Sequence, residues 1–397
     1  MKKQIVLASI ATLATTSAYA TRARMNALGQ AQDRGSFYIN DTRNVFRNAA
    51  RVNQTNNYAL TEWGTSSSTN SVTAPNAEGG FFKNAGSFNY GVYLGNNITN
   101  LNADVNTDGF ADAISAQTSG TLFGNTGFQK RSNDLDLFFG GDMGVEWGAR
   151  LKYSNSKNEQ GGTALETKHS ALELGLGMVM GDLNAYVNYV INDEYENIGT
   201  AATGFTAEND GTMNLGVGYK WMDYTFFVDY DKKGLEYVGG TGVAANTTED
   251  STLTVGAGYT KEVSSTSRMF ADISFKSRKL EDTDGTTAGN NLEVKRSTLP
   301  VTVGFETDAT SWLTVRGSIS QNVFINSQKE TLGTNPERKG TIANTTNVSA
   351  GATLNFGKLM IDGMIGTNGV NGQNTNATNG VLDTDRILTQ VAVHYWF

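Results

Sequence analysis

The chain ends on ILTQVAVHYWF, residues 387–397, and this stretch indicates the fold more directly than any other. Val391, Val393, Tyr395 and Phe397 occupy alternate positions, so their side chains fall on one face of an extended strand. A two-faced strand at the end of a chain needs a partner for its open edge. Pairing with the first strand of the same sheet would supply one and would close the sheet into a barrel.

The same alternation of apolar with small or polar residues recurs from residue 56 onward, in segments of about ten residues separated alternately by short and long breaks. The pattern predicts sixteen strands: 56–64, 76–83, 87–96, 132–140, 144–155, 168–180, 183–195, 209–220, 223–236, 250–260, 267–279, 292–306, 312–326, 346–356, 358–366 and 384–397. The first two have the weakest pattern, and without them the count is fourteen.

Two features favour a membrane barrel over a soluble β-sandwich. The rows opposite the apolar ones carry charged and amide residues along their whole length, and aromatic residues gather where strands meet short breaks. The predicted aromatic belt consists of Phe81, Phe82, Phe138, Phe139, Tyr219, Trp221, Tyr224, Tyr259, Phe270, Phe305, Trp312, Phe356, Tyr395 and Phe397. We therefore expect an all-β fold, a transmembrane antiparallel β-barrel over residues 56–397 with periplasmic short turns and termini and external long loops.

Residues 1–20 have the three parts of a secretory signal peptide. Lys2 and Lys3 are followed by an apolar stretch, and Ala18 and Ala20 flank Tyr19 in a small-x-small cleavage site. Removal of this segment would shift the formal net charge from -8 to about -10, which argues against nucleic acid as a partner. The chain has no cysteine, so an exported protein of this size would fold without disulfides.

The signal peptide, the glycine-rich chain without cysteine, the alternating strands and the terminal aromatic residue together resemble the outer-membrane porins of Gram-negative bacteria. More narrowly, the chain is similar to porin-like outer-membrane proteins of predatory bdellovibrios. The resemblance implies that Val391, Val393, Tyr395 and Phe397 form the signal read by the barrel-assembly machinery. It also implies an outer-membrane location, contact with lipid and lipopolysaccharide, passage of small hydrophilic solutes, and a homotrimer.

If the apolar rows face lipid, the opposite rows face the lumen. The predicted pore-lining residues are Asp134, Asp136, Glu146, Arg150, Glu173, Asp229, Asp231, Asp272, Lys276 and Arg316. Burying so many charges away from water would cost free energy unless each charge were well paired. A barrel of sixteen strands is wide enough to hold water. The pattern favours a water-filled channel, and a sealed interior of ion pairs is the alternative.

Residues 21–55 do not alternate and are basic, in contrast to the acidic chain that follows. We expect a helix over residues 41–53, with Asp41 capping its start and Arg43, Arg47 and Arg51 on one face. Glycines on inward rows, such as Gly177, could admit another backbone close to the wall. The segment is therefore expected to enter the lumen as a plug or constriction, with a periplasmic tail as the alternative.

Two rival functions remain open. Residues 45–49, VFRNA, loosely resemble the phenylalanine and Asn-Pro-Ala element in the hatch of long-chain fatty-acid transporters, although Ala49 stands in place of the proline. Those proteins resemble fourteen-stranded barrels that carry hydrophobic compounds, and the inward rows here show no apolar site. The Asn- and Gly-rich long loops would also suit a structural or adhesive barrel.

A calcium loop is predicted between residues 104 and 115. Asp104, Asn106, Asp108 and Asp112 occupy ligand positions, and Phe110 would contribute its carbonyl, but Ser115 stands where a bidentate acid is expected. No other cofactor is expected. With two histidines and no cysteine, the chain is not expected to be an enzyme.

Overall fold

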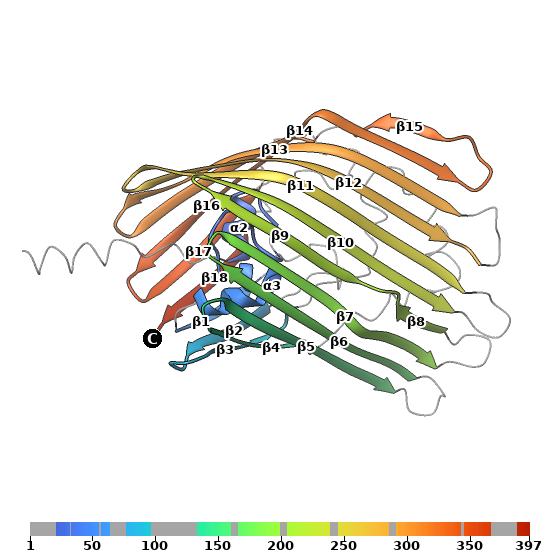
Figure 1. The fold of residues 1–397 in the computed structure, drawn as a ribbon, viewed down its shortest axis with the longest axis horizontal. Coiled ribbons are helices and arrows are strands. Elements are labelled where there is room, and N and C mark those ends of the chain that lie inside the picture. Colours follow the sequence, from blue (N-terminus) through green and yellow to red (C-terminus); the bar gives the residue numbers. More distant parts are fainter. Residues whose placement is uncertain are drawn as a thin grey trace, which may run out of the picture.

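The computed structural model describes residues 21–31, 33–54, 57–63, 77–96, 133–159, 166–198, 205–238, 245–285, 291–342, 345–366 and 387–397. The described part is a β-barrel with a non-strand segment at its start (Figure 1). The strands are β1 (Tyr58–Trp63), β2 (Ala77–Asn84), β3 (Asn89–Leu94), β4 (Leu135–Asp142), β5 (Glu146–Glu159), β6 (Glu166–Met180), β7 (Leu183–Ile198), β8 (Phe205–Asn209), β9 (Met213–Trp221), β10 (Tyr224–Val238), β11 (Asn246–Ser264), β12 (Ser267–Thr283), β13 (Leu292–Thr310), β14 (Leu313–Leu332), β15 (Arg338–Thr341), β16 (Asn347–Phe356), β17 (Leu359–Gly366) and β18 (Ile387–Trp396).

The sheet closes where the end of the chain meets the first strand. β18 pairs antiparallel with β1, from Tyr58 opposite Trp396 to Trp63 opposite Val391. β8 and β9 both lie between β7 and β10, and β15 and β16 both pair with β14, so each of these two pairs fills one position in the wall. The barrel therefore has sixteen strand positions, as predicted, and the alternative count of fourteen is wrong.

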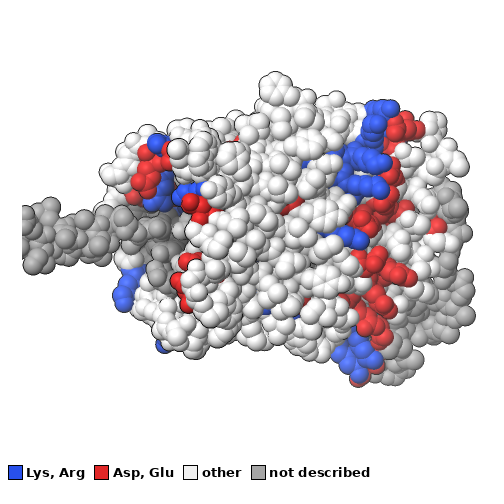
Figure 2. Space-filling view, viewed as in Figure 1, with Lys and Arg blue, Asp and Glu red and all other residues white. Residues whose placement is uncertain are grey.

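The outer face is the apolar one. In Figure 2 the middle of the barrel surface is almost free of charge, and Lys, Arg, Asp and Glu gather towards its two ends. The predicted aromatic belt is largely on this face, where Trp221, Phe356 and Tyr395 are about half exposed. Phe82, Phe138 and Phe270 are exceptions, because they are buried and point into the barrel. A closed antiparallel barrel with an apolar outer band is a transmembrane barrel of the outer-membrane type.

Adjacent residues of β11 offer a test of the two faces. Val255 is 46% exposed on the outer face, and Thr254 lies on the inner face between Asp229 of β10 and Lys276 of β12. We expect Val255→Arg to destabilise the barrel by about 2–4 kcal/mol because it places a cation in lipid. Thr254→Arg should cost much less, since Asp229 is its neighbour. Unfolding in urea from lipid vesicles measures both, and equal costs would contradict this assignment of faces.

Several strands extend beyond their predicted limits. β11 and β13 reach Ser264 and Thr310, so residues that we expected in short turns continue the ladder. The alternation fades there because both faces are polar at the rim of the barrel. No helix in the described part of the chain is long and apolar enough to cross a membrane.

Residues 21–54, called the N-terminal segment from here on, lie inside the barrel at the end of the short turns (Figure 1). The segment contains two short α-helices, α2 (Arg22–Ala27) and α3 (Asn44–Arg47), and a 3-10 helix, η1 (Ala49–Gln54). α2 contacts β14, β16, β17 and β18, whereas η1 contacts β3, β4, β5 and β6. The segment therefore spans the lumen from one side of the wall to the other.

Candidate functional site in the barrel interior

Helix α2 begins at a residue that is itself buried. The Thr21 hydroxyl accepts a hydrogen bond from the Arg24 backbone N–H at 3.1 Å, which caps the helix start. Ala23 and Ala27 pack against Met364 of β17. Small side chains on this side of the helix let its backbone lie close to the wall. The sequence pattern did not reveal this helix, because six residues are too few to show a period.

The helix that we expected over residues 41–53 is interrupted at Asn48, whose backbone is extended (φ -128°, ψ 106°). The Asn48 side chain donates to the carbonyls of Met178 and Ala185, at 3.1 and 3.3 Å, and its Oδ1 accepts from the Ala50 N–H at 3.0 Å. These bonds anchor the segment to the wall at the expense of helical geometry. The prediction that Arg43, Arg47 and Arg51 share one helical face is therefore wrong.

Glycines of the wall make room for the N-terminal segment. A Cβ atom added to Gly177 would lie 1.8 Å from Asn48 Oδ1, and one added to Gly148 would lie 2.3 Å from the Ala49 carbonyl oxygen. The other close approaches of this kind pair Gly218 with Phe37, Gly258 with Tyr38, Gly351 with Ala27 and Gly140 with Val52. Inward glycines on six strands therefore receive this segment, whereas Gly175, Gly216 and Gly256 face side chains of the wall itself.

Gly177→Ala is expected to loosen the N-terminal segment, because the new methyl group overlaps both Asn48 Oδ1 and the Ala50 backbone nitrogen. The matched control is Gly304→Ala, whose Cβ would have its three nearest atoms in β14, at 3.2 Å or more. Amide hydrogen exchange of residues 44–54 reads out the difference. Equal protection in the two variants would contradict the close packing at Gly177.

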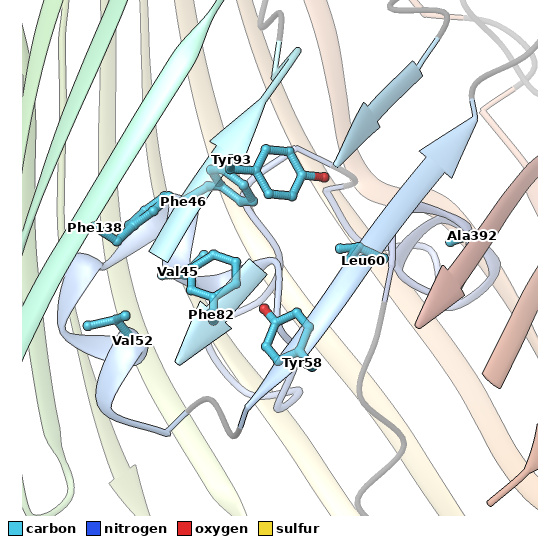
Figure 3. Close-up of a cluster of buried hydrophobic side chains, with 9 residues drawn as sticks. All are labelled: Val45, Phe46, Val52, Tyr58, Leu60, Phe82, Tyr93, Phe138 and Ala392. Carbon is cyan, nitrogen blue, oxygen red and sulfur yellow. The ribbon is translucent and has the colours of Figure 1, made fainter. Parts of the chain in front are cut away.

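An aromatic cluster joins α3 to the short strands β1–β4. Figure 3 shows Phe46 between Tyr93 and Phe138, and Tyr58 beside Phe82. The rings of Phe46 and Tyr93 are 4.9 Å apart edge to face, and Tyr58 stacks on Phe82 at 5.1 Å. This inward apolar patch escaped the sequence analysis, since we assigned Phe82 and Phe138 to the outer belt. It forms a core with Phe46 rather than an empty hydrophobic site.

Arg43 lies at the centre of a buried ion-pair group beside this cluster. Its Nη1 is 2.7 Å from Glu78 Oε1, 3.3 Å from Glu62 Oε2 and 3.1 Å from the Tyr93 hydroxyl oxygen. Arg22 reaches Glu78 Oε1 at 2.6 Å from the other side. The Arg43 guanidinium also lies 4.2 Å from the centre of the Phe46 ring. Desolvated charges tolerate burial when they are paired in this way.

A second ion-pair group holds α2 against the opposite wall. Arg24 donates to both oxygens of Glu306, at 2.7 and 3.0 Å, and to Asp41 Oδ2 at 3.2 Å. Arg316 bridges Glu306 and Asp362, at 3.1 and 3.2 Å. Burial raises the pKa of the Asp41 carboxyl to about 6, although Arg24 and the Arg43 backbone N–H act in the opposite direction. Asp41 caps the turn before α3, since its Oδ1 accepts from that N–H at 2.7 Å.

The three predicted constriction residues lie in different surroundings. Arg43 is fully buried and so does not face an open channel, which corrects that prediction. Arg47 donates to the carbonyls of Arg34 and Gly35, at 3.2 and 2.6 Å, and its guanidinium lies 4.3 Å from the centre of the Phe37 ring. Arg51 donates to Gln54 Oε1 at 2.6 Å. Arg47 and Arg51 are partly exposed.

The predicted pore-lining residues do face inward, but most of them contact protein groups rather than forming a bare wall. Their partners are Lys152 for Asp134 (3.9 Å), Arg150 for Asp136 (2.7 Å) and Glu173 (3.0 Å), Gln54 for Glu146 (2.8 Å), Tyr186 for Asp229 (2.7 Å), Arg34 for Asp231 (3.0 Å), Tyr38 for Asp272 (2.9 Å), and Glu306 and Asp362 for Arg316. Lys276 is exposed. The interior around the N-terminal segment is thus largely ion-paired, as in the alternative interpretation, through pairs within the wall and through Arg34 of the segment.

Next to the N-terminal segment, on the side of the long loops, lies a cavity of about 40 Å³. Charged groups of both signs line it: Arg34, Arg150, Glu173, Asp231 and Lys233. Asn188, Asn214 and Thr212 add amide and hydroxyl groups. Phe46, Val190 and Met213 also line it, so the cavity has a mixed lining of charged, polar and apolar groups.

The remaining predicted sites fall partly outside the described residues. Asp104, Asn106, Asp108, Phe110 and Asp112 all lie there, so the calcium loop stays a prediction. Within the described residues, no group of three or more histidine or acidic side chains could hold a metal ion. Val391, Val393, Tyr395 and Phe397 lie on the outer face of the barrel seam, and the Phe397 N–H donates to the Asn57 carbonyl at 3.3 Å.

No protein-family model matches the chain, and no curated protein matches it at a significant level. Among solved structures, a mutant of the Rh. blastica porin is similar at 10% identity and a TM-score of 0.30, covering 86% of this chain and 99% of that one. The Ralstonia pickettii toluene transporter TbuX is similar at 11% identity and a TM-score of 0.37, covering 96% and 99%. OmpT of Vibrio cholerae, folded in vitro, is similar at 11% identity and 0.35, covering 86% and 95%. Similarities this distant say nothing about which solute the chain carries. The resemblance to bdellovibrio proteins stays a prediction.

Proposed function

We propose that this protein is an outer-membrane porin, a channel for passive diffusion of small hydrophilic solutes and ions. The observation that carries the proposal is the inner wall between the N-terminal segment and the long loops. Charged groups of both signs are only partly buried there, as at Asp231, Lys233 and Arg278, and Lys276 is exposed. Partly buried charges of this kind are stable when water reaches them, and a barrel of this strand number can hold water.

The hydrophobic-transport alternative has less support. A hydrophobic solute needs an unoccupied apolar surface. Among the described residues, the inward aromatic cluster already packs against Val45 and Phe46 of the N-terminal segment. The N-terminal segment does occupy the barrel, as a hatch would, but its own apolar residues cover the inward apolar patches and buried ion pairs hold it to the wall. The interior chemistry therefore suits polar solutes better.

Swelling of protein-containing liposomes in isosmotic sugars tests the proposal. A porin admits small sugars at a rate that rises linearly with concentration and falls with sugar size. A saturable rate, or uptake of hydrophobic compounds alone, would favour a specific transporter. Entry of no solute by a correctly folded protein would contradict the proposal and favour a structural barrel.

Neighbouring lysines on opposite faces of β10 provide a sharper test of ion passage. Lys233 lines the cavity beside the N-terminal segment, whereas Lys232 points outward and pairs with Glu249 at 3.0 Å. We expect Lys233→Glu to shift the reversal potential of the channel towards cation selectivity, because it reverses a charge beside the ion path. Lys232→Glu should leave that potential unchanged. Planar-bilayer recordings in a salt gradient measure both, and equal shifts would contradict the assigned path.

The proposal includes the partners implied by the porin resemblance. Outer-membrane lipid and lipopolysaccharide would contact the apolar outer face and its charged rims, and the barrel-assembly machinery would read the C-terminal residues. A trimeric assembly is part of the proposal and is tested by native mass spectrometry in detergent. Calcium binding by residues 104–115 is tested by calorimetry against Asp104→Ala.

A further inference from the structure

The two ion-pair groups of the interior meet where the Arg43 backbone N–H donates to Asp41, and together they form a network with unequal formal charge. Four guanidinium groups belong to it: Arg22, Arg24, Arg43 and Arg316. Five carboxylates belong to it: Asp41, Glu62, Glu78, Glu306 and Asp362. None of these nine side chains exposes more than 10% of its surface. At the rim, Asp33 pairs with Arg22, and Arg268 pairs with Glu306 and Glu262, so these partly exposed groups add no net positive charge.

With all five carboxyls ionised, these nine groups carry one negative charge that has no counterpart among them. Burying an uncompensated carboxylate costs several kcal/mol, so a further cation beside it would stabilise the docked segment. The excess falls in the second ion-pair group, where Arg24 and Arg316 face three carboxylates, those of Asp41, Glu306 and Asp362.

Thr21 lies beside Asp362 and is fully buried. Its hydroxyl donates to Asp362 Oδ2 at 3.2 Å, and the next backbone N–H, that of Arg22, donates to Glu62 Oε1 at 3.1 Å. The backbone nitrogen of Thr21 is three bonds from its hydroxyl oxygen, so it lies near the same carboxylates. Thr21 is also the residue that follows the predicted cleavage site at Ala20.

We propose that removal of residues 1–20 creates an α-ammonium group at Thr21 that pairs with Asp362 inside the barrel and balances the buried network. A free amine at this position carries a positive charge at neutral pH, whereas the peptide nitrogen of the uncleaved chain does not. Signal-peptide removal then does more than release the chain for export. It supplies the cation that allows the N-terminal segment to dock.

The first test uses protein purified from the outer membrane. Intact mass and N-terminal sequencing should show a mature chain that begins at Thr21. Reductive methylation of the folded protein should then modify the Thr21 amine at least about tenfold more slowly than the exposed Lys83 amine, because modification would require the segment to open. A different first residue, or methylation as fast as at Lys83, would overturn the proposal.

The second test separates charge balance from simple packing. Two chains are refolded in lipid vesicles, one that begins at Thr21 and one that carries a short Gly-Ser extension before it. The extension moves the amine away, so trypsin should cleave the N-terminal segment faster in that chain. Asp362→Asn should then harm the chain with the free Thr21 amine more than the extended chain, where it removes the excess carboxylate. Equal harm in both chains, or no effect of the extension, would refute the role of the amine.

Discussion

Deleting residues 22–53 is expected to raise the single-channel conductance several-fold. The N-terminal segment crosses the lumen at the turn end, where it contacts β3–β6 on one side and β14 and β16–β18 on the other. Removing the segment replaces packed polypeptide with water in the cross-section of the barrel. Conductance in planar bilayers at high salt measures the change.

The same deletion should alter ion preference in a defined direction. Without the segment's arginines, Glu62 and Glu78 remain on the wall without their cations, and Glu306 keeps only its pairs with Arg316 and Arg268, so the shortened channel should select cations more strongly than the full chain. Heat-dependent mobility in gels provides the control that the shortened barrel is folded. Unchanged conductance and ion preference in a folded barrel would show that the segment does not restrict the channel.

The strands could be predicted from the sequence because residues of a transmembrane barrel alternate between the lipid-facing and the lumen-facing side. Lipid selects apolar residues at every second position, and the turns break that pattern at regular intervals. The closing pair of strands could be inferred for the same reason, since an open edge is not tolerated in lipid. Val391, Val393 and Tyr395 of β18 therefore identified the seam from their spacing alone.

The interior was harder to predict, because it depends on which distant residues meet. Phe82 and Phe138 look like belt residues in the sequence, but each lies on the inward row of its strand beside Phe46. The register of a strand decides this, and a slip of one residue exchanges its two faces. Inward glycines such as Gly177 gave a usable signal, because a missing side chain on a polar row needs a neighbour to fill the space.

The arginines illustrate the limit of local reasoning. A spacing of four residues places Arg43, Arg47 and Arg51 on one face only if the helix is continuous, and the bonds of Asn48 to the wall interrupt it. Tertiary contacts thus override a helical pattern that is too short to be stable alone. Arg43, which we expected in the channel, instead holds Glu62 and Glu78 together in the buried network.

Arg43→Met should release the N-terminal segment from the wall at a cost of about 3–5 kcal/mol, because it leaves two buried glutamates with one cation, Arg22, between them. The matched control is Arg47→Met, which removes hydrogen bonds to backbone carbonyls and a contact with the Phe37 ring. It should therefore cost markedly less. Amide hydrogen exchange of residues 21–54 in the folded barrel gives the opening free energy for each variant.

A double-mutant cycle identifies the charge as the cause of this loss. If Arg43→Met acts by stranding Glu78, then Glu78→Gln in the same chain should recover part of the protection, and the two effects should be less than additive. Additive losses would mean that Arg43 contributes mainly through its packing on Phe46. An opening free energy for Arg43→Met no lower than that for Arg47→Met would contradict the central place of Arg43 in the network.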